Sequence, residues 1–292
     1  MSRSRPRKGD PLARRVGRAL RQMVASSSAR EVRLAGEAAA RMQQPITTGR
    51  QIVVTSVRGG AGKTTIAALL GAAYAHHRAD PVLTMEADPT LGTLPLRAGA
   101  TSLRWTMSDL ARVVEPSMRF DQVIGYLVAL PEGGWLLPGS RGQIGAQVGL
   151  EAYQTVAMAL RRFFAVTVVD CATLPDEVAR SAMAGAQARV LATPATVDGV
   201  VSTRAVLDWM ASLPRPMLRG TVVALTATSA NPGVDLAAAE RYLRVGDARV
   251  VVLPHDRHVA AGGAIELGLL GQEIRVAVAE LAGELLSQAV RG

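Results

Sequence analysis

One stretch near the start of the chain constrains the fold more than any other. Over residues 53–70 a short apolar run, a glycine-rich turn and a segment rich in alanine and leucine follow one another. The apolar run has the composition of a buried strand and the last segment that of a helix. Gly59, Gly60 and Gly62 let the backbone curl so that successive N–H groups point inward. With a helix N-terminus behind them, these donors predict a phosphate-binding loop.

The loop also carries the polar side chains that phosphate chemistry requires. Lys63 would reach the β- and γ-phosphates of a nucleotide as a point charge, and the Thr64 hydroxyl would hold Mg²⁺. Lys63 is one of only two lysines, with Lys8, among 33 basic residues. A chain that uses arginine almost everywhere keeps a lysine here, where a compact ammonium fits among glycine amides. The alternative is a glycine-rich turn that binds nothing.

The loop departs from the strict pattern G-x-x-x-x-G-K-[ST], because Val57 stands where the first glycine belongs. It fits the deviant form K-G-G-x-G-K-[ST]-T, with Arg58 in place of the leading lysine. The residues predicted to bind the nucleotide in this loop are Gly59, Gly60, Ala61, Gly62, Lys63, Thr64 and Thr65.

Two further strands are predicted to end in acidic residues. The strand over residues 81–85 is followed by Glu86 and Asp88, and the apolar run over residues 165–169 by Asp170. The carboxyl ends of strands form the edge at which α/β proteins bind ligands. Asp88 is therefore a candidate for orienting an attacking water, although Asp-Pro is also a common turn. An apolar strand ending in Asp is the Walker B pattern, in which Asp170 would hold the Mg²⁺ shell.

The order of predicted elements indicates an α/β fold. Strands at 189–193, 221–226 and 249–253 alternate with helices at 198–212, 235–243 and 272–290. Such alternation predicts a mostly parallel sheet with helices on both faces. The middle of the chain is less regular, with helical patterns at 108–114, 119–130 and 149–164 and a short strand at 135–138.

The net charge of +9 lies in one segment. Residues 1–50 hold 12 basic and three acidic residues, whereas residues 51–292 hold 21 of each. We therefore divide the chain into a basic arm, residues 1–49, and a domain, residues 50–292. Apolar residues at helical spacing over 11–24 predict a basic amphipathic helix, which would bind an anionic membrane, nucleic acid or an acidic partner, or serve only as a solubilising tail.

Other classes of protein are disfavoured by composition. The single cysteine, Cys171, permits no internal disulfide, and no paired Cys/His spacing suggests zinc. No apolar run approaches the length of a membrane span, and no apolar segment follows the basic N-terminus as in a secretory signal. We expect a cytoplasmic protein.

Together these motifs resemble the MinD/ParA branch of the P-loop ATPases, which carry the deviant loop. The resemblance covers residues 50–290, and residues 249–262, RVVVLPHDRHVAAG, are similar to actinobacterial MinD-like proteins associated with type VII (ESX) secretion. It implies ATP and Mg²⁺ as cofactors, slow ATP hydrolysis, and two protomers that face each other across two nucleotides.

The resemblance also assigns roles to single residues. It implies that Lys63 binds the phosphates, Asp88 positions water and Asp170 holds the water shell of the metal. The loop around Pro254 would touch the adenine, and Arg58 would reach across a dimer to the phosphates of the partner. The chain departs from the family in two places: Glu86 replaces the usual Asp, and Thr226 stands where an Asn often contacts adenine.

The favoured hypothesis is a nucleotide-gated homodimer that acts as a switch. Its partner would be a secretion-system or envelope protein bound through the arm, at the inner face of the membrane. One alternative is a nucleotide-binding scaffold that no longer hydrolyses ATP. Another is a DNA-partitioning ATPase, which the neutral domain disfavours.

Overall fold

The computed structural model describes residues 33, 36–90, 92–213 and 217–291. Within these residues eight strands form one sheet in the order β3-β4-β2-β5-β1-β6-β7-β8. All neighbouring strands pair in parallel except β3 and β4. The strands are β1 (Arg50–Ser56), β2 (Val82–Glu86), β3 (Val128–Ala129), β4 (Trp135–Leu137), β5 (Val166–Asp170), β6 (Ala188–Pro194), β7 (Thr221–Thr226) and β8 (Arg249–Leu253).

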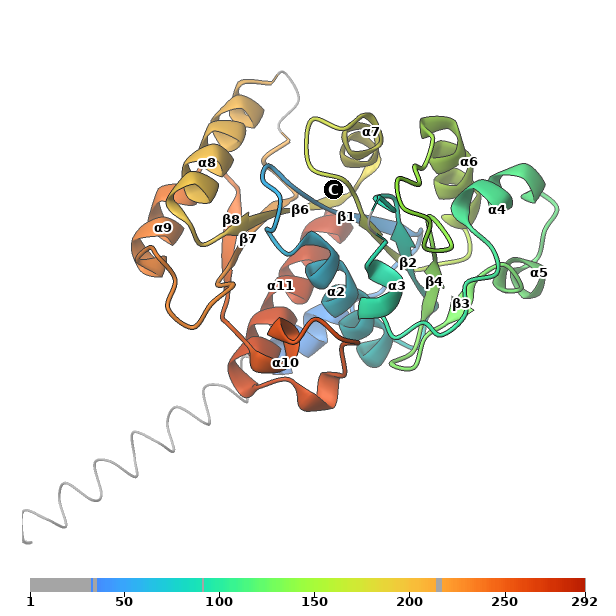
Figure 1. Cartoon of the computed structure of the whole chain (residues 1–292), viewed down its shortest axis with the longest axis horizontal. Helices are drawn as coiled ribbons and strands as arrows, with labels where there is room; N and C mark the ends of the chain where they lie inside the picture. The colour runs from blue at the N-terminus through green and yellow to red at the C-terminus, as the bar shows by residue number, and fades with distance from the viewer. Residues whose placement is uncertain (1–32, 34–35, 91, 214–216, 292) are drawn as a thin grey trace, which may run out of the picture.

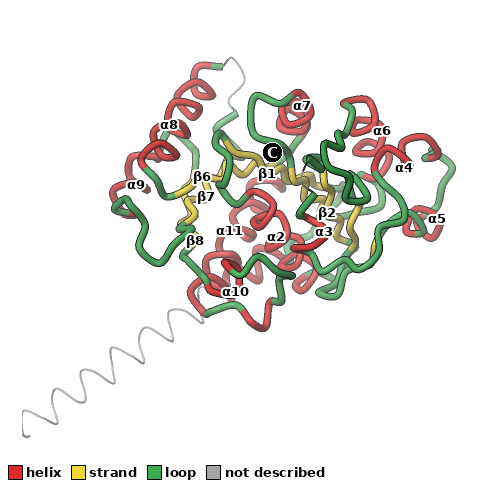
Figure 2. The backbone as a smooth tube through the Cα atoms, in the orientation of Figure 1, coloured by secondary structure: helices red, strands yellow, loops and turns green. Residues whose placement is uncertain are grey.

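Helices connect the strands and cover both faces of the sheet (Figures 1 and 2). They are α2 (Lys63–His77), α3 (Leu94–Arg97), α4 (Met107–Val113), α5 (Phe120–Ile124), α6 (Leu150–Leu160), α7 (Glu177–Gly185), α8 (Val197–Ser212), α9 (Leu236–Leu243), α10 (Arg257–Ala260), the 3₁₀ helix η1 (Leu267–Leu269) and α11 (Gln272–Arg291).

The central strand β1 shows why the chain builds two cores. Ile52 and Val54 belong to the core formed with α2 and α11, whereas Val53 belongs to the core on the opposite face. Side chains alternate between the faces of a strand, so an unbroken apolar run supplies both cores. The helix over residues 36–42 packs on the first core, where Met42 is fully buried. None of the described helices is long and apolar enough to cross a membrane.

The order of the strands fixes where a ligand can bind. From β1 the chain moves outward to β2 on one side, and after β5 it crosses to β6 on the other. The connections therefore leave β1 and β5 in opposite directions, and α/β proteins bind ligands at the carboxyl ends of strands where this occurs. The glycine-rich turn between β1 and α2 lies at these carboxyl ends.

The α/β fold with a mostly parallel sheet is confirmed, and the main differences lie in the middle of the chain. The prediction of a helix over 119–130 was wrong in its second half, because α5 stops before Gly125 and β3 pairs with the edge strand β4. Helix α7 was not predicted, although its N-cap Asp176 accepts a hydrogen bond from the Ala179 N–H. The amphipathic helix predicted over 11–24 lies outside the described residues.

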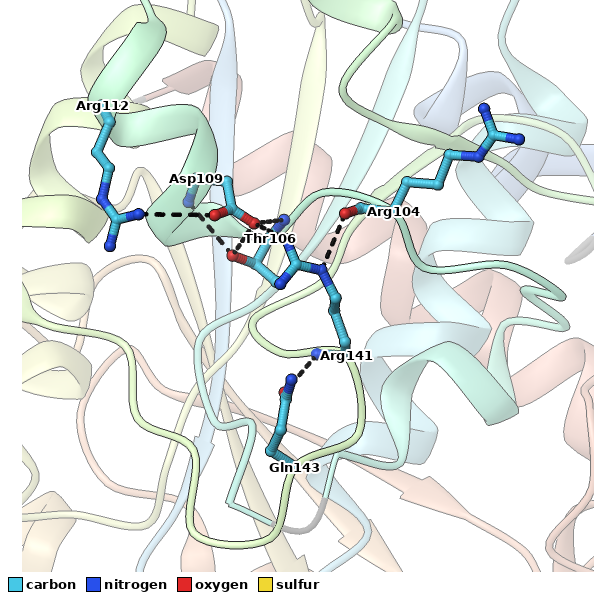
Figure 3. A network of polar contacts seen from close by, with 6 residues as sticks. All are labelled: Arg104, Thr106, Asp109, Arg112, Arg141 and Gln143. Carbon is cyan, nitrogen blue, oxygen red and sulfur yellow. Dashed lines mark hydrogen bonds and ion pairs between the residues drawn. The ribbon is translucent and has the colours of Figure 1, made fainter.

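A polar network fixes the irregular segment between α3 and α6 (Figure 3). The carboxylate of Asp109 accepts hydrogen bonds from the backbone and hydroxyl of Thr106, which caps α4, and pairs with Arg141 at 2.6 Å. Partial burial raises the pKa of Asp109, but the hydrogen bonds from Thr106 and the charge of Arg141 outweigh it and hold the pKa below its ordinary value. The network thereby joins α4 to the loop that follows β4.

We predict that Asp109→Ala lowers the free energy of unfolding by about 1–2 kcal/mol, because it removes the carboxylate of the capping box with Thr106 and the partner of Arg141. Since the pKa of Asp109 is lower in the folded state, its contribution is complete above the pKa of the unfolded chain. It is lost as the pH falls through the lower folded-state value. Urea titrations at pH 7 and pH 3 measure both effects.

Asp121→Ala is the matched control. Asp121 forms an exposed ion pair with Arg119 and contributes no comparable cap, so its removal leaves the urea midpoint unchanged. An equal loss of stability in the two variants would contradict a special role of Asp109.

Candidate functional site

The turn between β1 and α2 has the backbone of an anion-binding loop. Gly60 and Gly62 adopt φ angles of 73° and 82°, which disfavour any residue with a side chain. Gly62 is the N-cap of α2 and has no side chain to satisfy the first N–H groups of the helix. The space beside Gly59 and Gly60 is open. The turn therefore presents unsatisfied donors to an accessible surface.

The back of the loop is held by the protein itself. Ala61 is buried in the core, so only its backbone can serve a ligand. The Ser56 hydroxyl donates to the Arg58 carbonyl at 2.8 Å, and a methyl carbon of Thr226 lies 3.7 Å from the Cβ that Gly62 lacks. These contacts shape the turn before any ligand binds.

Lys63 lies at the centre of the polar groups. Its ammonium nitrogen donates to the Thr173 hydroxyl at 3.3 Å and lies 3.9 Å from a carboxylate oxygen of Asp88. Its side chain is only 13% exposed. The structure thus brings together Lys63 and Asp88, which are 25 positions apart in the sequence.

Asp170 ends β5 beside these groups. It is 1% exposed, and neither of its carboxylate oxygens accepts a hydrogen bond from the described residues. Burial raises the pKa of Asp170 to about 7, and the nearby Thr64 hydroxyl and the charge of Lys63 limit that rise. A buried carboxylate without a partner costs folding free energy, which indicates a place where a ligand completes the site.

Glu86, the last residue of β2, and Asp88, two positions later, face different surroundings. Glu86 is fully buried, and one of its oxygens accepts a hydrogen bond from the Gly139 N–H at 2.9 Å. Burial raises the pKa of Glu86 as well. Asp88 is 26% exposed and lies toward Lys63. Of the pair, Asp88 alone contacts the glycine-rich turn through an ion pair.

Two predicted residues lie further from this centre. Pro254 follows β8 at the same edge of the sheet, three strands from β1. Arg58 is exposed, and its Nε donates to the Ser202 hydroxyl of α8 at 3.1 Å. The side chain of Arg58 thus contacts a helix of its own chain.

The donor set fits Mg²⁺ bound together with a nucleotide. Among the described residues no group of three or more His, Cys, Asp or Glu side chains could hold a metal by itself. Mg²⁺ commonly takes one or two protein oxygens and completes its shell with phosphates and water. Thr64 and the unpartnered Asp170 supply that number of ligands.

Sequence reasoning missed Thr173 and Arg97. Thr173 follows β5 by three positions; its hydroxyl accepts from Lys63 and shares a hydrogen bond with the Ser56 hydroxyl at 3.3 Å. Its proximity to Asp170 in the sequence was the available signal. Arg97 donates to the Thr65 hydroxyl at 3.1 Å from a helix that the sequence did not predict.

A cleft of about 1250 Å³ lies at the opposite edge of the sheet, at the amino-terminal ends of β6, β7 and β8. Arg189, Arg219 and Arg249 are among its lining residues, and none of the predicted site residues reaches it. The candidate site is therefore defined by its chemistry and not by its volume.

Comparison with curated proteins identifies relatives of the chain. It is 31% identical over 241 residues to the ESX-1 secretion-associated protein EspI of Mycobacterium tuberculosis, a match that covers 80% of this chain and 36% of EspI. It is 30% identical over 155 residues to the septum site-determining protein MinD of Synechocystis, covering 52% of this chain and 55% of MinD. No protein-family model matches.

Solved structures share the fold. A ParA family ATPase from Chlorobium tepidum superposes with a TM-score of 0.67 at 14% identity, over 80% of this chain and 98% of that one. MinD from Pyrococcus horikoshii with Mg-ADP gives 0.59 at 19% identity, over 81% and 96%. MinD in the MinC:MinD complex of Aquifex aeolicus gives 0.58 at 18%, over 82% and 96%.

The chain is a MinD/ParA-like P-loop protein. Its resemblance to this branch and to EspI is confirmed, and it spans about a third of the length of EspI and about half that of MinD. In this MinD/ParA-like chain the deviant loop keeps the glycines and Lys63, whereas Arg58 replaces the leading lysine.

We predict that Asp170→Asn stabilises the ligand-free MinD/ParA-like protein in a pH-dependent way. Because the pKa of Asp170 is raised in the folded state, ionisation destabilises the fold as the pH rises from about 4, its unfolded value, to about 7. We expect a gain of roughly 2–4 kcal/mol at pH 8 and little at pH 4. Thermal unfolding at both pH values measures it.

Glu177→Gln provides the control, because Glu177 is exposed on α7 and this substitution removes the same negative charge as Asp170→Asn. It is expected to change neither midpoint. A gain for Asp170→Asn that is equal at pH 4 and pH 8 would contradict the prediction.

Proposed function

We propose that this protein binds Mg·ATP at the turn between β1 and α2, hydrolyses it slowly, and acts as a nucleotide-gated dimeric switch. The observation that carries the proposal is the position of the Lys63 ammonium. It lies in the phosphate loop against Thr173 and Asp88, next to the buried and unpartnered Asp170. A cation, a hydroxyl and two acids around a cradle of N–H groups suit a nucleoside triphosphate and Mg²⁺.

Each predicted residue has a task at such a site. The N–H groups of Gly59, Gly60, Ala61 and Gly62 and the ammonium of Lys63 would neutralise phosphate oxygens, with Thr64 and Thr65 at the start of α2. Thr64 and Asp170 would hold Mg²⁺. The bound metal would stabilise the negative charge of the β- and γ-phosphates.

Asp88 is suited to orient the attacking water. It is partly exposed and paired with Lys63 at a distance longer than a hydrogen bond, so it can accept a hydrogen bond from water. Glu86 is engaged with Gly139 and would instead fix the neighbouring loop. The loop around Pro254, with Thr226 at the end of β7, would contact the base.

Arg58 would link the nucleotide to dimer formation. An exposed hydrogen bond to Ser202 and the nearby charge of Asp198 hold its guanidinium on α8, and both are worth little compared with a phosphate pair. Arg58 can therefore leave α8 and reach the phosphates of a second protomer. Joining two protomers would require ATP, because its charge is the partner of Arg58.

The cellular role is inferred from the relatives and from the arm. EspI is a secretion-associated protein of the ESX-1 system. We propose a partner in type VII secretion or at the cell envelope, bound through the basic arm. The location would be the cytoplasm, including the inner face of the membrane.

A non-hydrolysing scaffold is the second candidate. It is favoured by the burial of Glu86 against Gly139 and by the contact of Arg58 with its own chain, since both remove a group from the phosphates. The two candidates differ in one measurement. Phosphate release at protein concentrations where dimers form excludes the scaffold, whereas tight ATP binding without release excludes the switch.

We predict that Lys63→Ala lowers the rate of ATP turnover by about 100-fold or more, because it removes the cation aimed at the transferring phosphate. Phosphate release by the purified full chain measures it. Lys8→Ala is the matched control, since Lys8 is the only other lysine in the sequence and lies in the arm. Equal rates in the wild type and Lys63→Ala would end the proposal.

We also predict that removing residues 1–25 abolishes binding to vesicles that contain phosphatidylglycerol. The deletion takes away eight basic residues, Arg3, Arg5, Arg7, Lys8, Arg14, Arg15, Arg18 and Arg21. Each contributes about 1 kcal/mol near an anionic surface at low salt. Sedimentation with vesicles measures it, and vesicles of phosphatidylcholine serve as the control.

Binding to vesicles that survives the deletion would contradict a role for the arm. A gel shift of arbitrary duplex DNA that disappears with the deletion and weakens steeply with salt would instead favour the DNA-partitioning alternative.

A further inference from the structure

Arg97 is a buried cation that the proposed reaction does not use. It is the last residue of α3, which lies beside α2 (Figure 1), and it is 5% exposed. Within the described part of the chain no carboxylate forms an ion pair with it, and its Nε has no hydrogen-bond partner. A buried guanidinium without an acid is costly, so its remaining contacts require an explanation.

Those contacts join two separate parts of the site. On one side Nη2 donates to the hydroxyl of Thr65 in the first turn of α2. On the other side Nη2 donates to the carbonyl of Val259 at 3.0 Å and Nη1 to that of Gly263 at 2.8 Å. One planar group therefore connects the phosphate-binding helix to the segment after β8.

The segment after β8, residues 254–265, is held at further points. The Ile265 N–H donates to the Arg97 carbonyl at 2.8 Å. Asp256 accepts hydrogen bonds from the N–H groups of Val259 and Gly271, which fixes α10 to the start of α11. The Arg97 side chain ties this segment directly to Thr65 in the first turn of α2.

The contact also fixes the hydrogen bonding of Thr65. A hydroxyl has one hydrogen to donate, and the Thr65 oxygen already accepts from Arg97. The Thr65 hydroxyl keeps its own hydrogen to donate, and the guanidinium makes it a better donor.

We propose that Arg97 is a positioning residue that sets the separation between the phosphate subsite at Thr65 and the base subsite after β8. A nucleoside triphosphate would then be recognised as one unit, whereas a triphosphate without a nucleoside would not use the link. The inference rests on the proposed nucleotide site, and it assigns to this site a residue that contacts neither phosphate nor base.

Calorimetry of the full chain with Mg²⁺ and either ATP or inorganic tripolyphosphate tests the proposal. Arg97→Met removes the hydrogen bonds at similar length, and we expect about tenfold or greater loss of ATP affinity. Tripolyphosphate affinity should change by less than about threefold, since Lys63 and the glycine N–H groups remain. Arg97→Lys keeps the charge but not the planar fork, and should lie between.

Arg78→Met is the matched control for a purely structural effect. Arg78 is also buried, its side chain 3% exposed, and it donates to the carbonyls of Met42 and Gln44 at the other end of α2. Its loss should lower the melting temperature and leave the ratio of ATP to tripolyphosphate affinity unchanged.

The outcomes separate the two proposals. If the wild type binds neither ligand, the proposed function fails. If the wild type binds ATP and Arg97→Met keeps the wild-type affinity ratio, the positioning role is overturned and the nucleotide site stands. Should Arg97→Met not fold, Arg97→Lys decides: an unchanged ratio overturns the role, and a lowered ratio supports it.

Discussion

The register among three neighbouring parallel strands, β2, β5 and β1, holds the candidate site together. Asp170 pairs with Glu86 of β2 and with Val54 of β1, so the acidic turn, the carboxylate of Asp170 and the glycine-rich loop leave the sheet at one edge. The strands are buried on both faces, and a slip of one residue would move every apolar side chain to the wrong core. Packing in the two hydrophobic cores thus fixes the positions of the polar groups at this edge, although the core side chains would not contact the ligand.

The buried polar groups around the candidate site lower the stability of the folded protein when no ligand is bound. Asp170 and one oxygen of Glu86 are buried without hydrogen bonds, and Arg97 is buried without an acid. Apolar residues in these places would stabilise the folded chain. For Asp170 this cost is explained if a ligand supplies the missing partner, because binding to the folded state alone adds stability that rises with affinity. The buried carboxylate of Asp170, which destabilises the protein alone, would therefore favour the complex with Mg²⁺ and nucleotide.

Arg58 and Arg97 illustrate two uses of arginine around one loop. Arg58 is exposed and is held on α8 by a hydrogen bond to Ser202 and by the charge of the exposed Asp198, so little free energy opposes its movement toward a second protomer. Arg97 is enclosed and makes three hydrogen bonds that join α2 to the segment after β8. In the proposed switch the first would respond to the nucleotide and the second would hold the subsites at a fixed distance. The exposure of Arg58 would then allow it to move, and the burial of Arg97 would hold it in place, although both residues are arginine.

Local pattern in the sequence was sufficient for the α/β class, the loop and its glycines, and the acids at two strand ends. These features depend on residues close together in the chain, where period, glycine conformation and strand-end chemistry act directly. The pairing of strand β3 with β4, the contact of Lys63 with Thr173 and the tie from Arg97 to Gly263 were not predictable in this way. They join residues whose separation is set by packing of the whole sheet. Tertiary structure decided which acid faces Lys63, because only the fold turns Glu86 toward Gly139 and leaves Asp88 at the open edge.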